Sequence, residues 1–109
     1  MSIQLKSEDS RSVAGTALTG TLADVGSPTT SPARTVVFFN GCDDQVVVSW
    51  DDGRTEGFDL PPSSAVAIDC AISPGENNAR PYLGVGSQFQ AKHDGVAPTT
   101  GKLSITVIV

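Results

Sequence analysis

The stretch from residue 34 to residue 70 most constrains the fold, because it holds three short β-strand patterns joined by tight turns. Residues 34–40 and 45–50 are rich in β-branched and aromatic side chains, which favour strands. Between the second and third patterns, Asp52-Gly53 is a pair that accepts the positive φ angles of a type I′ hairpin turn. The third strand is expected over 56–60 and is ended by Pro61 and Pro62. Strands this close together predict an all-β domain.

The rest of the chain continues the pattern. Residues 64–72 alternate between apolar and other side chains, residues 88–92 and 102–109 are further expected strands, and a weaker strand is expected over 13–22. No segment shows a sustained helical period. Seven or eight short strands predict a small antiparallel β-sandwich, jelly-roll-like or immunoglobulin-like, or a small barrel. The residues expected to be buried are Val36, Phe38, Val46, Val48, Val66, Ile68, Phe89, Leu103 and Ile105.

A chain of 109 residues is long enough for one domain. Residues 1–12 are polar and mixed in charge, and we expect a flexible N-terminal arm there, followed by a single sandwich over 13–109. Fixing each backbone residue costs ~1–2 kcal/mol, so the arm is expected to order only by burying Ile3 and Leu5 against another protein. The apolar C-terminal strand, with Val107 and Val109, must likewise be paired within the chain or by a neighbour.

Acidic side chains gather between residues 43 and 59, where six acids and one base give −5, the net charge of the whole chain. Nucleic-acid binding needs clustered Lys and Arg, so it is not expected. The acidic stretch is either a solvated hairpin face or a docking face for a basic neighbour. In the second case the contact residues are Asp43, Asp44, Asp51 and Asp52.

No stretch approaches the ~20 apolar residues of a membrane span, and the first ten residues lack the layout of a signal peptide. The chain is therefore expected in the cytoplasm where it is made, with no membrane partner. Cys42 and Cys70 are too few for a disulfide framework. Two buried thiols are favoured, and a bridge between them is the alternative.

Residues that could carry chemistry lack the context that chemistry needs. His93 lies at an expected turn, without an oriented partner or a nucleophile. Asp51 and Asp52 lack the spacing of a calcium loop, and the Gly-rich residues 84–87 precede no helix that could bind phosphate. Neither enzymatic activity nor a cofactor or metal is expected.

The order of the pieces is more informative than any single motif. A strand ends at Asn40, a second strand enters Val-Ser-Trp-Asp-Asp-Gly53, and a Leu-Pro-Pro turn leads to an alternating strand at 66–70. A Gly-x-Gly-Ser-Gln-Phe-Gln-Ala-Lys-His-Asp-Gly95 run, an Ala-Pro-Thr-Thr-Gly101 turn and a closing Leu-x-Ile-x-Val strand follow. Over residues 34–109 this order resembles small β-sandwich structural proteins of tailed bacteriophages.

The resemblance implies a virion protein that acts by contact, made in the cytoplasm of a host bacterium. Its expected role is a head decoration or cement protein that stabilises the capsid and binds the major capsid protein or other virion proteins, as a homo-oligomer on the particle. A neck, collar or tail component is the alternative. A second alternative is a cytoplasmic ligand-binding β-sandwich, which would present exposed aromatic residues such as Trp50 or Tyr82.

Overall fold

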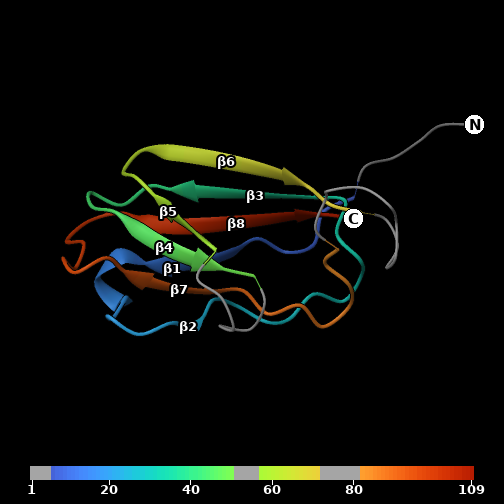
Figure 1. Ribbon diagram of the computed structural model, residues 1–109, viewed down its shortest axis with the longest axis horizontal. Helices are drawn as coiled ribbons and strands as arrows, with labels where there is room; N and C mark the ends of the chain where they lie inside the picture. Colours follow the sequence, from blue (N-terminus) through green and yellow to red (C-terminus); the bar gives the residue numbers. More distant parts are fainter. Residues whose placement is uncertain (1–5, 51–56, 72–81) are drawn as a thin grey trace, which may run out of the picture.

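The computed structural model describes residues 6–50, 57–71 and 82–109, and regular structure in these ranges is almost entirely β-strand (Figure 1). One turn of 3-10 helix, Gly15–Ala17, is the helical element of these ranges, and none of their helices could cross a membrane. The expected all-β class is confirmed. The strands are β1 (Arg11–Ala14), β2 (Ala23–Asp24), β3 (Thr35–Asn40), β4 (Val46–Ser49), β5 (Phe58–Leu60), β6 (Ser64–Asp69), β7 (Gln90–His93) and β8 (Lys102–Ile108).

These strands form two antiparallel sheets of four, in the orders β1-β8-β3-β6 and β2-β7-β4-β5. The pairs β1–β8, β2–β7, β3–β6 and β4–β5 are nested like the arms of one long hairpin. Rolling this hairpin up brings β3 against β8 and β4 against β7, which completes the two sheets. This is the arrangement of a jelly roll. The domain is therefore a β-sandwich of the jelly-roll type, and not a closed barrel.

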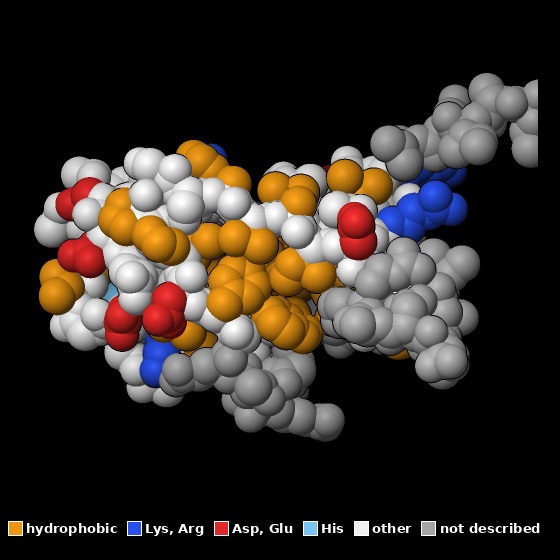
Figure 2. Space-filling view, turned by 45° about the horizontal axis from the view of Figure 1, so that its top comes forward, with side chains coloured by type: hydrophobic (Ala, Val, Ile, Leu, Met, Phe, Trp, Pro, Cys, Tyr) orange, Lys and Arg blue, Asp and Glu red, His pale blue; other side chains and the backbone are white. Residues whose placement is uncertain are grey.

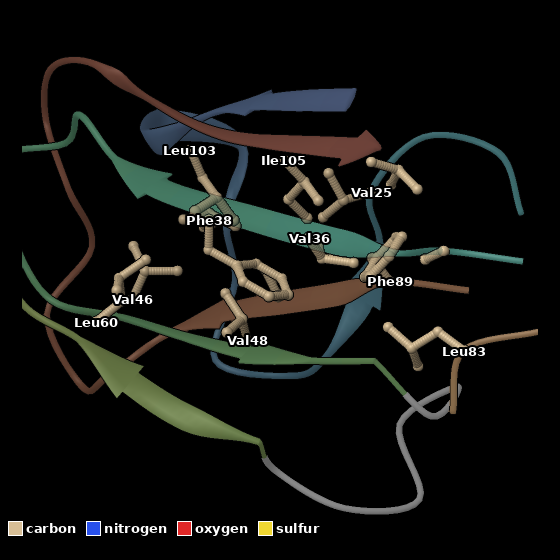
Figure 3. Packing of buried hydrophobic residues seen from close by; sticks show 14 of the residues in the cluster. Val25, Val36, Phe38, Val46, Val48, Leu60, Leu83, Phe89, Leu103 and Ile105 are labelled. Carbon is tan, nitrogen blue, oxygen red and sulfur yellow. The ribbon is translucent and has the colours of Figure 1, made fainter. Parts of the chain in front are cut away.

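The core lies between the two sheets (Figure 3). Side chains of β3 and β8 point from one sheet toward side chains of β4 and β7 from the other, with Phe38 near the centre. The ring of Phe38 meets the rings of Phe58 and Phe89 edge-on, at centroid distances of 5.3 and 5.9 Å. Seven of the nine residues expected to be buried are fully buried, namely Val36, Phe38, Val46, Val48, Phe89, Leu103 and Ile105.

Val66 and Ile68 are the two exceptions, because they are only half-buried although they pack against the core. Both point inward from β6, as the alternation predicts. However, within the described part of the chain, β6 is the last strand of its sheet and pairs with β3 alone. Its inward side chains therefore lie at the open side of the sandwich, where the opposite sheet covers them on one flank alone.

The weak strand expected over 13–22 is wrong. The chain leaves the first sheet after Ala14, makes the 3-10 turn at 15–17 and enters the second sheet at Ala23. Gly15 permits this crossing, since a Cβ there would lie 2.8 Å from the Cβ of Pro98 and 3.0 Å from the sulfur of Cys42. The alternating pattern predicts one strand, but the chain changes sheet within it.

Residues 6–12, which the sequence assigned to the N-terminal arm, lie on the sandwich. Arg11 and Ser12 belong to β1, and Ser7 forms an isolated bridge with Ile108. The Glu8 N–H donates to the carbonyl of Val107 at 3.0 Å, and the Val109 N–H donates to the carbonyl of Lys6 at 2.8 Å. Residues 1–5, including Ile3 and Leu5, lie outside the described residues.

Candidate interaction face

The outer face of the sheet β1-β8-β3-β6 carries two neighbouring rows of uncharged side chains. Phe39 stands in the first row with 45% of its surface exposed, and the ring lies over Gly41, where a Cβ would be 3.1 Å from Cε1. Strand register places the first row as Ser12, Ser104, Phe39 and Ala65, and the second as Thr106, Val37 and Ala67. No charged side chain interrupts either row.

Alternation in β3 explains why this strand contributes apolar side chains to the face. Val36 and Phe38 are fully buried, so Val37 and Phe39 must point out of the sheet. Apolar side chains on both sides of a strand are typical of a strand that is covered on both faces. Within the described residues, β3 is covered on its inner side only.

Charged residues lie only at the two ends of this face. At one end, the hydroxyl of Thr35 donates to the carboxylate of Asp69 at 3.3 Å, across the β3–β6 pair. At the other end, Lys102 begins β8. The uncharged rows lie between them, the first running across all four strands and the second across β8, β3 and β6.

The outer face of the second sheet is different. Gln45 donates to Asp94 at 2.6 Å, and Gln90 donates to Asp24 at 2.7 Å. Val47, the apolar residue on that side of β4, is only 2% exposed and stands between Asp59 and Lys92. Polar and charged side chains therefore cover the outer face of the sheet β2-β7-β4-β5, as is usual in a β-sandwich. The outer face of the sheet β1-β8-β3-β6 carries charged side chains only at its two ends.

The apolar surface continues around β6 toward the open side of the sandwich. In the view that brings β6 forward, hydrophobic side chains extend across the middle of the molecule, and acidic side chains gather toward one end (Figure 2). The half-buried residues of this side are Val66 and Ile68 of β6, with Phe58 and Trp50, whose ring centroids lie 5.7 Å apart.

Two of the residues expected to contact partners lie in β8 or directly after it. Val107 is fully buried in the core of this chain, so its side chain packs inside the sandwich. Val109 is half-buried and packs against the same core. β8 itself lies between β1 and β3, and both its edges are paired within the chain. The C-terminal strand therefore offers no free edge to a neighbour.

Asp43 and Asp44 lie in the connection from β3 to β4 and take part in bonds within the chain. The Thr99 N–H and hydroxyl and the Thr100 N–H all donate to the Asp43 carboxylate. The bond from the Thr99 hydroxyl, together with the two N–H bonds, lowers the pKa of Asp43. The Asp44 carboxylate accepts the Gln45 N–H at 2.8 Å. Asp51 and Asp52 lie outside the described residues.

A second carboxylate, Glu8, ties the N-terminal segment to the loop that precedes β3. It forms an ion pair with Arg11 at 2.7 Å and accepts the N–H groups of Thr30 and Ser31, each at 3.0 Å. Arg11 is 6% exposed and also donates to the carbonyls of Ser27, Pro28 and Asp9. This network lines a shallow hollow, but its polar atoms are already bonded to one another. We therefore assign it a structural role.

His93, Cys42 and Cys70 are three further side chains of chemically reactive types. His93 is half-buried at the end of β7, rather than exposed in a turn, and its buried Nδ1 has no hydrogen-bond partner. Both cysteines are buried thiols. In the ranges that the structure describes, no three His, Cys, Asp or Glu side chains are grouped so that they could hold a metal ion.

No protein-family model and no curated protein matches the sequence, so these comparisons assign the chain to no family. The candidate site rests on geometry alone. It consists of the uncharged outer face around Phe39 and the neighbouring side of β6. Sequence reasoning missed these residues as a site, although the apolar residues on both sides of β3 were a usable signal.

Proposed function

We propose that this chain is a structural protein of a bacteriophage virion that acts by protein–protein contact. Its favoured role is capsid decoration, in which it binds the major capsid protein and stabilises the head. One observation supports a contact role most strongly. The outer face of the sheet β1-β8-β3-β6 carries two rows of uncharged side chains, with Phe39 exposed in the first. The order of turns and strands that resembles phage sandwich proteins supports the virion setting.

The physical argument concerns the cost of leaving such a face in water. An exposed aromatic residue among small uncharged side chains buries apolar area on contact without stripping water from charges. Aromatic anchors of this kind account for much of the binding energy in protein interfaces. A decoration protein that binds only the assembled shell stabilises the shell by mass action. The geometry of this face suits that role better than it suits catalysis.

The test is binding to phage particles stripped of this protein. Phe39→Asp should weaken binding by about thirtyfold or more, since loss of a central aromatic anchor costs at least ~2 kcal/mol. Val96→Asp is the matched control, because Val96 is 57% exposed in the loop after β7 and lies outside the face. The control should bind like the wild type.

The readout also separates the alternatives within the virion. Electron microscopy of labelled protein on particles should show label over the head. Label confined to the neck or tail would replace decoration with the collar or tail role. Failure of the wild type to bind any part of the virion, or equal binding by the Phe39 variant, would overturn the proposal.

A further inference from the structure

We propose that two copies of this chain associate through β6, edge to edge and antiparallel, so that their sheets join into one sheet of eight strands. The inference goes beyond the proposed function, because it concerns a backbone edge that the outer-face contact does not use. It can also be tested on the purified protein without any particle.

Among the strands that the structure describes, β6 has a partner on one edge only, and its second edge motivates the proposal. β6 has six residues and is the longest of the four edge strands, since β1 has four, β5 has three and β2 has two. Edge strands in soluble proteins are usually protected by Lys, Pro, bulges or shortness. β6 contains no Lys, Arg or Pro, and its one charge, Asp69, is its last residue.

Backbone geometry shows which groups the edge offers. The Cys70 N–H donates to the carbonyl of Arg34 at 2.8 Å, so residue 70 points toward β3. Alternate residues of an antiparallel strand point the same way, which directs Ser64, Val66 and Ile68 toward β3 as well. The N–H and C=O groups of Ala65, Ala67 and Asp69 therefore point away from β3, toward the open edge.

These groups fit a second copy of β6 in one register. A two-fold axis at Ala67 places Ala67 opposite its counterpart and Ala65 opposite Asp69 of the other copy. All three outward-pointing residues of each strand then exchange backbone hydrogen bonds, which follows from the pairing rule for antiparallel strands. Self-complementarity of this kind is what a two-fold interface requires.

The side chains agree with the backbone. On the inner side, Val66 of one copy meets Ile68 of the other, and both are half-buried apolar residues at the open side of the sandwich. On the outer side, the exposed Ala65 and Ala67 are small enough for the strands to approach. Pairing would thus cover the apolar side chains that the single chain leaves half-exposed.

The charges also permit this occupant. The two Asp69 carboxylates would lie four residues apart along the joined strands, about 13 Å, and each would face an alanine. Each chain carries a net charge of −5, so the copies repel at long range. Salt screens this repulsion beyond about 8 Å at physiological ionic strength. Association should therefore strengthen as salt is added, whereas binding of a basic partner at this edge would weaken.

A strand pair alone is smaller than the roughly 1,600 Å² of a standard interface, so we expect weak association in solution. Sedimentation equilibrium at several hundred micromolar, where such weak complexes form, should give a mass that rises from 11.2 kDa toward twice that value. Ala67→Pro should stay monomeric, because proline removes an outward N–H that β3 does not use. Ser12→Pro on β1 is the matched control, since its N–H also points away from its partner strand, and it should associate like the wild type.

A second variant keeps the test decisive if Ala67→Pro does not fold. Ala67→Cys would place two thiols across the two-fold axis, with Cα atoms about 5.5 Å apart, within the range that a disulfide spans. Mild oxidation should give covalent dimers of this variant and not of Ser12→Cys. A wild type that stays monomeric at these concentrations, or Ala67→Cys chains that cross-link no faster than the Ser12 control, would overturn the proposal. Neither result would bear on binding of Phe39 to particles.

Discussion

The carboxylate of Asp43 binds Thr99 across 56 residues of sequence, and through this contact the turn after β3 holds the loop that leads into β8. Glu8 does the same for Thr30 and Ser31 in the loop before β3. The loops at 27–30 and 97–100 both read Pro-Thr-Thr after a small residue. Glu8 accepts the N–H and hydroxyl of the second threonine of its loop, Thr30, and the N–H of Ser31 after it. Asp43 accepts the N–H and hydroxyl of the first threonine of its loop, Thr99, and the N–H of Thr100. Asp43 and Glu8 thus each bind a loop that is distant in the sequence and hold it in place by hydrogen bonds.

Replacing Asp43 by Ala should lower the melting temperature, because the Thr99 and Thr100 N–H groups lose their acceptor. Asp59→Ala is the control, since Asp59 lies exposed on β5 and its loss should leave the melting temperature nearly unchanged. Thermal unfolding by circular dichroism measures both. Equal effects of the two substitutions on the melting temperature would show that the Asp43 hydrogen bonds contribute nothing to stability.

Stability should fall in acid. Burial acts to raise the pKa of Glu8, but the hydrogen bonds from Arg11, Thr30 and Ser31 outweigh it and lower the pKa below its ordinary 4.5. The pKa of Asp43 is lowered below 3.8. A group with a lowered folded-state pKa stabilises the fold above its unfolded pKa and loses that contribution as pH falls through the folded value.

Denaturant unfolding between about pH 5 and pH 2 tests this prediction. The wild type should lose stability over that range, and Glu8→Gln/Asp43→Asn should start lower and lose less. Parallel pH profiles for the two proteins would contradict it.

Asn40→Ala should destabilise the domain by roughly 3 kcal/mol, because it leaves three backbone groups unsatisfied in a buried place. The Asn40 amide donates to the carbonyls of Asp44 and Leu60, and its oxygen accepts the Cys42 N–H. The control is Gln90→Ala, which removes an exposed hydrogen bond from the Gln90 side-chain amide to Asp24 and should cost about 0.5 kcal/mol or less. Urea unfolding gives both free energies, and similar values would refute the assignment.

Gly101→Ala should destabilise the domain by about 3 kcal/mol or more, since a Cβ there would overlap the carbonyl of Gly41. Its φ of +83° also lies in the left-handed region that favours glycine. Gly95 has a similar φ of +80° but open space around it, so Gly95→Ala isolates the backbone strain at about 1 kcal/mol. A larger loss at Gly95 than at Gly101 would contradict this account.

Both thiols should resist modification until the protein unfolds. Cys42 and Cys70 are 2% and 1% exposed, and burial, together with the charge of Asp43, raises the pKa of the Cys42 thiol. They follow opposite ends of the β3–β6 pair, about 20 Å apart, which is too far for a bridge. A thiol reagent should find no reactive thiol in the native protein and two in denaturant. A single rapid native reaction, or no thiols after unfolding, would contradict this prediction.

Alternation predicted the inward side of most strands correctly, because burial on one face imposes a period of two on the side chains. It placed Phe89, Leu103 and Ile105 in the core, and β-branched and aromatic content placed β3 within one residue of its observed bounds. It failed between residues 13 and 22, since a chain that changes sheet can keep an alternating pattern by chance. It also left open how the terminal strand is paired, because a pattern does not say whether its partner lies within the chain.

The sequence by itself thus determined the all-β class, the strand positions and the inward faces, which depend on local pattern and turn chemistry. Only the tertiary structure decided which strands lie at the edges of the sheets and which carboxylates bind distant loops. Those features depend on contacts between residues far apart in the chain, such as Asp43 with Thr99 and β8 with β1 and β3. The uncharged outer face around Phe39 and the open edge of β6 also depend on such distant contacts. The order of the strands in the sheets decides what covers an apolar residue.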